Sequence, residues 1–377
     1  MFNPNQNTVM ANKNLHQAKE NKADEFYTQL PDIENELRHY REHFKDKVVL
    51  CNCDDPRVSN FFRYFALNFE FLGLKKLICT CYKNQDVDLF SQKESEQAVY
   101  MVYEGDKNGD VLDFSEVEVI PLQGDGDFRS PECIELLKQA DIVVTNPPFS
   151  LFREYIAQLM KYEKKFIVLG RMSAIHYIDV FPHIMENRIW MGHGFNISMI
   201  YKAPYENTLE ANKKYVKSKG YNPDDNYIKV PAICWFTNLE HNKRQEKLIL
   251  FKKYTPEEYP KFDNYDAIEV GKVTEIPGDY DGIMGVPDTF LGSFNPEQFR
   301  ILGVTQKGCH DAVPTTKVYD DYWEMKQNGT KTGASGKKTN ENANLRKNDG
   351  KHNYFINKDG DVIQSAYSRI FIQRIDL

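Results

Sequence analysis

Short apolar runs alternate with amphipathic segments through the first half of the chain. Runs bounded by polar or turn residues predict buried strands at 47–53, 75–82, 141–146 and 164–170. Apolar residues at helical spacing predict helices at 32–44, 58–71, 131–140 and 151–162. Strands joined through helices by short links are typical of βαβ units, so the pattern favours an α/β fold with a mainly parallel sheet. A later apolar run predicts one more core strand at 230–239.

The chain is long enough for two domains. Its 377 residues can bury a large core and form a catalytic domain with a smaller second one. We expect the first domain at 1–254, with an insertion at about 190–229, and the second at 255–377. No pair of histidines in the segment 171–229 has a carboxylate at metal-ligand spacing, so we interpret them as packing or loop residues and expect no metal.

The charge balance limits how the protein meets its partners. A net charge of −7 excludes nucleic-acid binding through bulk charge, so any contact with a duplex must use local basic patches. The chain has no apolar stretch of membrane-spanning length, and its first residues, MFNPNQNTVMANKN, are polar. We therefore expect a cytoplasmic protein that does not contact a membrane.

The tetrapeptide Asn146-Pro147-Pro148-Phe149 directly follows the predicted strand 141–146. The carboxyl ends of strands are where open α/β sheets bind ligands. The two prolines stiffen the turn, so that it presents the Asn146 side chain and the carbonyls of Asn146 and Pro147 as acceptors. An exocyclic amino group supplies matching donors, and Phe149 offers an aromatic face to its heterocycle. A flipped adenine fits this turn, whereas a surface Asn-Pro-Pro turn is the alternative without chemistry.

Asn146-Pro-Pro-Phe resembles the catalytic signature of S-adenosylmethionine-dependent amino-methyltransferases, above all those acting on adenine N6 in DNA. Further motifs occur in the order DEFYTQ (24–29), CNCDDPRVSNFF (51–62), GDGDFRS (124–130), the catalytic turn and CWFTNL (234–239). Together they resemble the EcoRI-type family of adenine-specific DNA methyltransferases, most strongly at 22–165 and again at 263–268 and 284–299. The resemblance implies a Rossmann-like class I methyltransferase domain with a mostly parallel seven-stranded sheet, and a smaller carboxyl-terminal target-recognition region.

The same resemblance implies S-adenosyl-L-methionine as the cofactor. The chain lacks a glycine between Val48 and Gly73, where most methyltransferases have a glycine-rich turn, and this absence is itself a trait of the EcoRI-type family. In the GDGDFRS loop, a carboxylate can accept the cofactor's amino group and Phe128 can pack on its ring, although a plain Gly-Asp turn is equally compatible with these residues. The ribose ligand is unassigned. We expect cofactor contacts from Phe26, Tyr27, Thr28, Asp54, Asp55, Pro56, Asp127, Phe128 and Asn146.

Two basic segments are the candidates for DNA contact. Residues 326–351 carry seven Lys or Arg and two acids, a local charge of +5, and we interpret them as a flexible basic loop inside a folded module. A solvated loop without a partner is the alternative. A second cluster lies at 213–219. The DNA-binding residues that we expect are Lys213, Lys214, Lys331, Lys337, Lys338, Arg346 and Lys347.

Seven cysteines and no leader favour reduced thiols. Cys51 with Cys53 and Cys79 with Cys81 each place two thiols on one face of a predicted strand. A zinc site is conceivable, but Cys-x-Cys is not the usual knuckle spacing, so buried and inert thiols are the favoured interpretation.

These observations predict a site-specific methyltransferase that modifies adenine N6 in duplex DNA, for restriction-modification or for protection of phage or host DNA. We expect double-stranded DNA as its partner and a monomeric enzyme, and any cognate restriction endonuclease would act as a separate protein. The alternatives are an RNA or protein-glutamine amino-methyltransferase and a non-catalytic nucleic-acid-binding module on the same fold. An N4-cytosine enzyme is disfavoured, because Asn146 stands where Ser or Asp would be expected.

Overall fold

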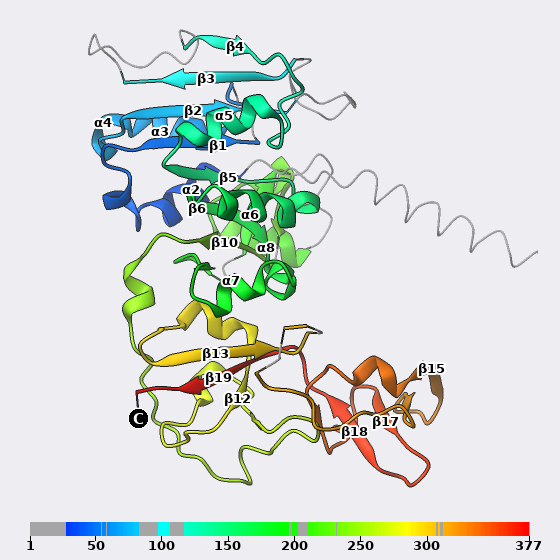
Figure 1. The fold of residues 1–377 in the computed structure, drawn as a ribbon. Coiled ribbons are helices and arrows are strands. Elements are labelled where there is room, and N and C mark those ends of the chain that lie inside the picture. The colour runs from blue at the N-terminus through cyan, green and yellow to red at the C-terminus, as the bar shows by residue number, and fades with distance from the viewer. Residues whose placement is uncertain are drawn as a thin grey trace, which may run out of the picture.

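The computed structural model describes residues 28–53, 55–57, 59–82, 97–105, 117–195, 198–202, 210–230, 232–306, 308–309 and 312–376. Its largest sheet has eight strands in the order β4-β3-β2-β1-β5-β6-β10-β7 (Figure 1). Their bounds are β1 Val48–Asn52, β2 Lys76–Thr80, β3 Val99–Tyr103, β4 Val119–Pro121, β5 Ile142–Thr145, β6 Lys165–Arg171, β7 Trp190–Met191 and β10 Ile233–Thr237. The three central pairings, β2 with β1, β1 with β5 and β5 with β6, are parallel, and the four outer pairings are antiparallel.

Helices cover both faces of this sheet. One face packs against α2 (Leu30–Leu37), α3 (Asn60–Leu67) and α4 (Phe69–Leu72), and the other against α5 (Pro131–Gln139), α6 (Phe152–Lys161) and α7 (Phe181–Met185). Alternate residues of a strand point to opposite faces, so Val49 and Cys51 of β1 join the first cluster and Val48 and Leu50 join the second. Burial on both faces explains why the central strands are continuous apolar runs.

Local sequence signals set the ends of these helices. Ser59 caps α3, since its hydroxyl accepts hydrogen bonds from the backbone N–H groups of Phe61 and Phe62. Ser130 caps α5 in the same way, with Pro131 in the first turn. The predicted helix 58–71 is interrupted at Asn68, and α4 ends at Gly73 in the left-handed conformation. The predicted helix 32–44 is divided into α2 and the 3-10 turn η1 (Arg41–His43).

A small subdomain lies between β7 and β10 in the chain. It contains a two-stranded antiparallel sheet, β8 (Met199–Lys202) with β9 (Tyr227–Val230), and the basic helix α8 (Glu210–Ser218). The turn η4 (Pro223–Asp225) joins α8 to β9. An isolated bridge between Thr28 and Tyr201 connects this subdomain to the segment that enters α2.

The carboxyl-terminal part contains two further sheets. The four-stranded sheet, in the order β11-β12-β19-β13, comprises β11 Ile268–Glu269, β12 Met284–Pro287, β13 Phe299–Val304 and β19 Arg369–Arg374. The five-stranded sheet, in the order β15-β14-β17-β18-β16, comprises β14 Trp323–Met325, β15 Lys331–Ser335, β16 Asn344–Leu345, β17 Tyr354–Ile356 and β18 Val362–Ser365. The remaining 3-10 turns are η2 Phe149–Leu151, η3 Met172–His176, η5 Asn242–Gln245, η6 Val273–Glu275, η7 Asp288–Ser293 and η8 Gly336–Thr339.

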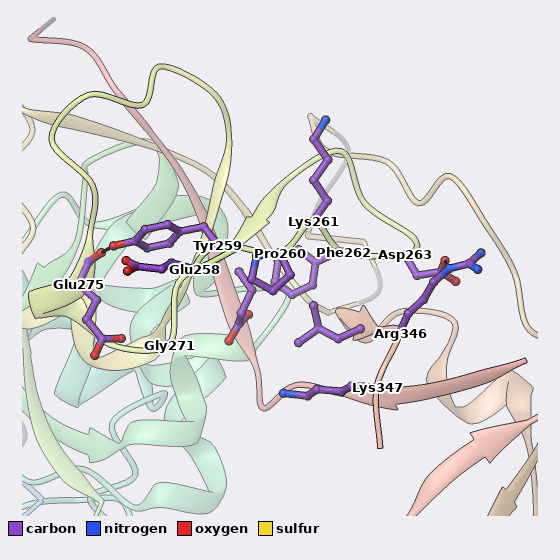
Figure 2. Close-up of a pocket in the computed structure, with 12 residues that line it drawn as sticks. Glu258, Tyr259, Pro260, Lys261, Phe262, Asp263, Gly271, Glu275, Arg346 and Lys347 are labelled. Atoms are coloured by element: carbon purple, nitrogen blue, oxygen red, sulfur yellow. Dashed lines mark hydrogen bonds and ion pairs between the residues drawn. The ribbon is translucent and has the colours of Figure 1, made fainter. Parts of the chain in front are cut away.

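A pocket of about 640 Å³ lies in this carboxyl-terminal part, away from the large sheet (Figure 2). Its wall consists of residues 258–263, parts of the segment 269–275 and residues 345–347. Acidic side chains, Glu258 and Glu275, lie toward one end of the pocket, and basic side chains, Arg346 and Lys347, lie toward the other.

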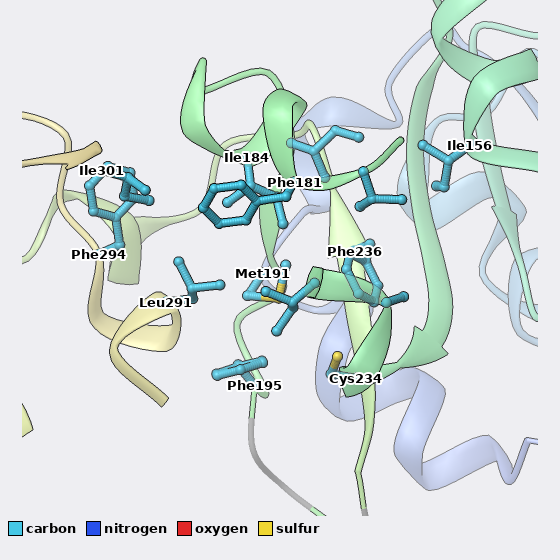
Figure 3. Close-up of a cluster of buried hydrophobic side chains, with 14 of the residues drawn as sticks. Ile156, Phe181, Ile184, Met191, Phe195, Cys234, Phe236, Leu291, Phe294 and Ile301 are labelled. Carbon is cyan, nitrogen blue, oxygen red and sulfur yellow. The ribbon is translucent and has the colours of Figure 1, made fainter. Parts of the chain in front are cut away.

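One hydrophobic cluster extends from the large sheet into the four-stranded sheet. Phe181 and Ile184 of α7 and Met191 of β7 pack toward Leu291 and Ile301 of the carboxyl-terminal part (Figure 3). All five side chains are at most 6% exposed. The division at 254 therefore separates two groups of strands that share apolar packing, and the domain limits themselves stay a prediction.

The observed sheet corrects part of the predicted fold. The predicted strands at 47–53, 75–82, 141–146, 164–170 and 230–239 are all present, and the fold is mixed α/β. The expectation of a mostly parallel seven-stranded sheet was wrong, because β3 folds back beside β2 and β10 returns beside β6, each antiparallel to its neighbour. Antiparallel neighbours need no crossover helix between them, so the alternation of helices and strands does not reveal such pairings.

The described residues contain no helix that is long and apolar enough to cross a membrane. Cys51 and Cys79 lie side by side in the register of β1 and β2, and both thiols are buried. Among the residues that the structure describes, no three His, Cys, Asp or Glu side chains converge as metal ligands.

Candidate active site

The candidate site lies where the large sheet changes its winding direction. The chain passes from β1 through α3 to β2 on one side of β1, and later returns through α5 to β5 on the other side. The carboxyl ends of β1 and β5 therefore border the crevice in which open α/β sheets bind ligands. Asn52 and Cys53 end the first of these strands, and Thr145 and Asn146 end the second.

The catalytic turn begins inside the protein and ends at its surface. Asn146 is 2% exposed and Pro147 is buried, whereas Pro148 and Phe149 are partly exposed. Phe149 opens the turn η2, which leads directly into α6. The sequence prediction for the turn is confirmed in its position after a buried strand, while the catalytic roles of its four residues stay a prediction.

Buried hydroxyl groups join the turn to the end of β1. The Thr145 hydroxyl donates a hydrogen bond to the backbone carbonyl of Asn52, and the Tyr155 hydroxyl of α6 donates one to the Asn52 side-chain oxygen. Burial raises the pKa of Tyr155 well above its ordinary value, so the phenol stays protonated and can only act as a neutral donor. Asn52 is thus held by residues on both sides of the catalytic turn, which fixes β1 and β5 relative to each other.

Sequence reasoning missed this support and a cation above the turn. The guanidinium carbon of Arg171, the last residue of β6, lies 5.5 Å from the centroid of the Phe149 ring. The sequence predicted Tyr155 only as a residue on the apolar face of a helix. Its polar function follows from the placement of Asn52 103 positions earlier, and no local spacing signals that contact.

The glycine-free turn after β1 still uses a glycine-like conformation. Cys53 has φ = 86°, in the left-handed region that side chains seldom adopt, and its N–H donates to the Thr80 carbonyl at 3.1 Å. Asp55 and Pro56 follow and are buried. Asp55 is held by the Arg57 guanidinium, with Oδ2 2.5 Å from Nη2. A carboxylate therefore lies after the carboxyl end of β1 and is paired with an arginine, and its contact with a cofactor stays a prediction.

The loop 124–128 packs against the end of β2. Gly126 has φ = 77°, and a Cβ built there would lie 2.1 Å from the Cys81 carbonyl oxygen, so only glycine fits. Asp127 accepts hydrogen bonds from Arg129, which hold the pKa of the Asp127 carboxyl below its ordinary value. The Phe128 ring is 6% exposed and meets Tyr155 edge-on at 5.0 Å. The structure uses Phe128 in core packing, and its contact with a cofactor stays a prediction.

Of the remaining predicted cofactor residues, the structure describes only Thr28. The Thr28 carbonyl accepts a hydrogen bond from the Asn60 side chain at 2.8 Å, which places Thr28 beside the first turn of α3. Phe26, Tyr27 and Asp54 lie outside the described residues.

The basic segment 326–351 is folded, so the expectation of a flexible loop was wrong. It contains β15, η8 and β16, and β15 pairs with β14. The sequence of this segment does not indicate strands because its residues are polar. Its strand β15 forms by pairing with β14, which lies just before the segment. Lys331 lies 4.2 Å above the Trp323 ring, Lys338 pairs with Glu324 at 3.2 Å, and Arg346 pairs with Asp263 at 2.5 Å.

The predicted DNA-binding residues divide between two places. Lys213 and Lys214 belong to α8 beside the large sheet, whereas Lys331, Lys337, Lys338, Arg346 and Lys347 belong to the five-stranded sheet or its loops (Figure 1). All five residues of the second group are exposed, and Arg346 and Lys347 also border the pocket in Figure 2.

Comparison with known proteins assigns the family. A family model described as "Adenine-specific methyltransferase EcoRI" matches residues 14–375. The chain belongs to this family. Membership in the EcoRI methyltransferase family confirms the resemblance seen in the ordered motifs, and it confirms the predicted enzyme class, an adenine-specific methyltransferase. An enzyme of this class needs a methyl donor.

Three curated relatives of the EcoRI methyltransferase family cover most of the chain. Type II methyltransferase M.EcoRI of Escherichia coli is 53% identical over 306 residues, which cover 78% of this chain and 91% of that protein. Type II methyltransferase M.MpnI of Mycoplasma pneumoniae is 42% identical over 292 residues, covering 76% and 84%. Type II methyltransferase M.MgeORF184P of Mycoplasma genitalium is 39% identical over 299 residues, covering 76% and 85%. No solved structure matches the chain significantly.

Proposed function

We propose that this protein transfers a methyl group from S-adenosyl-L-methionine to N6 of a flipped adenine at a specific site in double-stranded DNA. The observation that carries the proposal is the buried Asn146, followed by two prolines and a partly exposed phenylalanine, at the switch point of the sheet. Family membership supplies the specificity for adenine. Restriction-modification or protection of phage or host DNA is the expected role, with any cognate endonuclease a separate protein and the methyltransferase a monomer.

The catalytic turn localises the lone pair on the adenine nitrogen. The side-chain carbonyl of Asn146 and the backbone carbonyl of Pro147 accept the two hydrogens of the amino group, which makes the nitrogen more nucleophilic. Phe149 stacks on the flipped base, with Arg171 on the ring to restrict its movement. This site provides position and fixed dipoles in place of a strong base, because the Tyr155 hydroxyl beside it stays protonated.

The residues at the carboxyl ends of β1 and β2 fit a nucleoside cofactor. When bound, S-adenosyl-L-methionine supplies an electrophilic methyl group. The left-handed turn at Cys53 and the close packing of Gly126 on Cys81 bring two polar loops together at one edge of the sheet. Asp55 and Asp127 lie in these loops, each held by an arginine two positions later. A carboxylate fixed in this way keeps lone pairs in place for hydroxyl or amino donors.

The exposed basic residues on α8 and on the five-stranded sheet are the proposed phosphate contacts. Phosphate contacts set the position of a protein on DNA, and base-edge contacts read the sequence. We propose residues 255–377 as the target-recognition region, since they carry most of the exposed basic residues named here and a pocket next to them.

Transfer of tritiated methyl groups to duplex DNA tests the proposal. The expected product after digestion is N6-methyladenine, and sequencing that detects this base then gives the recognition sequence. N4-methylcytosine as the product would contradict the assignment to adenine. Methylated RNA or protein with unmodified DNA would contradict the choice of substrate. Calorimetry without measurable affinity for S-adenosyl-L-methionine would instead indicate a binding module without catalysis.

A further inference from the structure

Tyr367 is an exposed aromatic side chain on a fixed backbone. The side chain is 78% exposed and lies in the connection between β18 and β19. The Ala366 N–H donates to the Ala343 carbonyl at 2.8 Å, and the Arg369 N–H donates to the Thr305 hydroxyl at 2.9 Å. The connection is therefore anchored on both sides of Tyr367.

A buried arginine also holds the backbone of this connection. Arg369 is 7% exposed and is paired with Glu269 through two nitrogens. Its remaining nitrogen donates to the carbonyls of Tyr367 and Ser368 at 3.2 and 3.1 Å. A single exposed aromatic side chain is ordinary on a protein surface. It is less usual for a charged and largely buried residue to fix the backbone beneath such a side chain. Support of this kind is typical of a side chain whose position matters for binding.

The chain enters β19, two residues after Tyr367, on the side of the molecule where the central parallel strands end. In Figure 1 the β19 arrow runs opposite to the central parallel strands, so β19 starts on the side where those strands end and toward which the five-stranded sheet projects. Direct contacts also join this connection to the end of β6. The turn η3 follows β6 in the chain, and its His176 is 2.8 Å from an Asp288 carboxylate oxygen and 3.4 Å from the Ser368 hydroxyl. A five-residue 3-10 turn spans about 10 Å, so Tyr367 is close enough to the end of β6 for both to meet one duplex.

Exposed apolar, aromatic and basic side chains lie at Tyr367 and in the segment after His176. Ile178, two positions after His176, is 51% exposed and lies against Gly308 in the loop after β13. The His352 ring meets Tyr367 edge-on at 6.4 Å and is itself held by Asp349. Arg153, which is more than half exposed, lies over the Tyr177 ring beside Ile178, and its guanidinium is 3.8 Å from an exposed Asp179 carboxylate oxygen. Aromatic and apolar side chains next to a cation are the groups that unstack and replace bases in DNA.

We propose that Tyr367 enters the DNA base stack when the target adenine turns out, and that Ile178 packs beside it. The inference rests on the proposed function, because it requires a flipped base. An aromatic ring in the vacated position recovers stacking that the duplex loses, and so favours the flipped state.

The test uses a duplex with the recognition sequence found by the methylation experiment, in which 2-aminopurine replaces the target adenine. Its fluorescence rises when the base leaves the stack. We expect Tyr367→Ala to lower both the fluorescence increase and the single-turnover rate on normal DNA by about tenfold or more, because the ring no longer stacks on the neighbouring base. Tyr367→Phe and Tyr367→Trp should keep both signals. A duplex without a base opposite the target should restore both signals in Tyr367→Ala, because less unpairing is required.

Phe251→Ala is the matched control. Phe251 is 71% exposed, and its segment is bound to Gln298 beside the carboxyl end of β19, about 20 Å from the start of that strand. A Tyr367→Ala variant that flips and methylates like the wild type would overturn the inference, and so would an equal loss in the Phe251 variant. If the wild type methylates no DNA, the proposed function fails instead, and the two failures are thereby distinguished.

Discussion

At the scale of single residues, the proposed chemistry depends most on Asn146. Replacing it with Ala removes one of two acceptors for the adenine amino group, so the transition state loses stabilisation that the ground state does not need. We expect the single-turnover rate of methylation to fall by about 10²- to 10³-fold, by analogy with a lost oxyanion donor. Cofactor affinity measured by calorimetry should change little. A variant that methylates DNA near the wild-type rate would contradict the assigned role.

Contacts between residues that are distant in the sequence could not be predicted from the sequence. The position of Asn146 followed from a short apolar run and two prolines, both of which are local. The pairing of Asp55 with Arg57 and of Asp127 with Arg129 is local too, but a sequence contains many such spacings and few of them form contacts. The contact of Arg171 with Phe149 depends on the adjacency of β5 and β6 and could not be inferred before the sheet order was known.

The loop 124–128 is the element on which the cofactor proposal depends most. Gly126→Ala would add a Cβ into the Cys81 carbonyl at a positive φ, so the loop must move away from β2. We expect cofactor affinity to fall by tenfold or more and the free energy of unfolding to drop by at least about 1 kcal/mol.

Gly124→Ala is the matched control for this loop. Gly124 has no positive φ, and a Cβ there would lie 3.9 Å from its nearest neighbour, a Glu132 carboxylate oxygen. Cofactor titration and thermal unfolding of both variants decide the question. Equal behaviour of the two variants would show that the packing of the loop on β2 does not position the cofactor.

Histidines between α2 and the edge of the large sheet predict a loss of stability in acid. The His241 ring is buried and 3.0 Å from the Met191 carbonyl, and burial lowers its pKa to about 4. His39, stacked on His193 at 3.4 Å, also has a pKa of about 4, first because of burial and then because of its neighbour. Unfolded histidine binds a proton below about pH 6.5. Between pH 6.5 and 4 the unfolded chain therefore binds more protons, and stability falls as the pH falls.

Chemical denaturation across this pH range tests the prediction on His241. The side chain alone should account for up to about 3 kcal/mol between pH 6.5 and 4, since one unit of pKa corresponds to about 1.4 kcal/mol. His241→Gln removes this titration and should make the stability of the protein less dependent on pH. An unchanged slope in the variant would show that His241 is not responsible.

Elements were predictable where they are continuous and apolar. The strands β1, β2, β5, β6 and β10 lie in the core and appeared as uninterrupted runs. The strand β3, the edge strand β4 and the polar strand β15 did not, because their formation depends more on pairing with a neighbour than on a buried face of their own. The five-stranded sheet of the carboxyl-terminal part consists mostly of such strands, which is why sequence periodicity described that part of the chain poorly.

At the scale of the whole molecule, the large sheet and the four-stranded sheet share one hydrophobic core. The cluster that includes Phe181, Met191, Leu291 and Ile301 ties the large sheet to the four-stranded sheet. The connection from β19 back to the five-stranded sheet passes Tyr367 and Arg369. The shared core and this connection hold the five-stranded sheet relative to the large sheet. Under the proposed function, contacts made with DNA far from the adenine can therefore fix the position of that adenine.

The exposed basic side chains on the five-stranded sheet should set the affinity for DNA without setting its specificity. With a net charge of −7 the protein has little bulk attraction for DNA, so the loss of local charges should be readily visible. Lys337→Gln with Lys347→Gln should weaken binding to all sequences alike and reduce the salt dependence of binding by about 0.9 for each phosphate that is no longer neutralised. Lys338→Gln with Arg346→Gln removes the same charge but also breaks the ion pairs with Glu324 and Asp263, so it should lower stability as well.

Binding curves at several salt concentrations, with thermal unfolding of both double variants, measure these effects. A wild-type salt slope and affinity in the first double variant would exclude Lys337 and Lys347 from the DNA interface, and a changed site preference would assign them to base recognition instead.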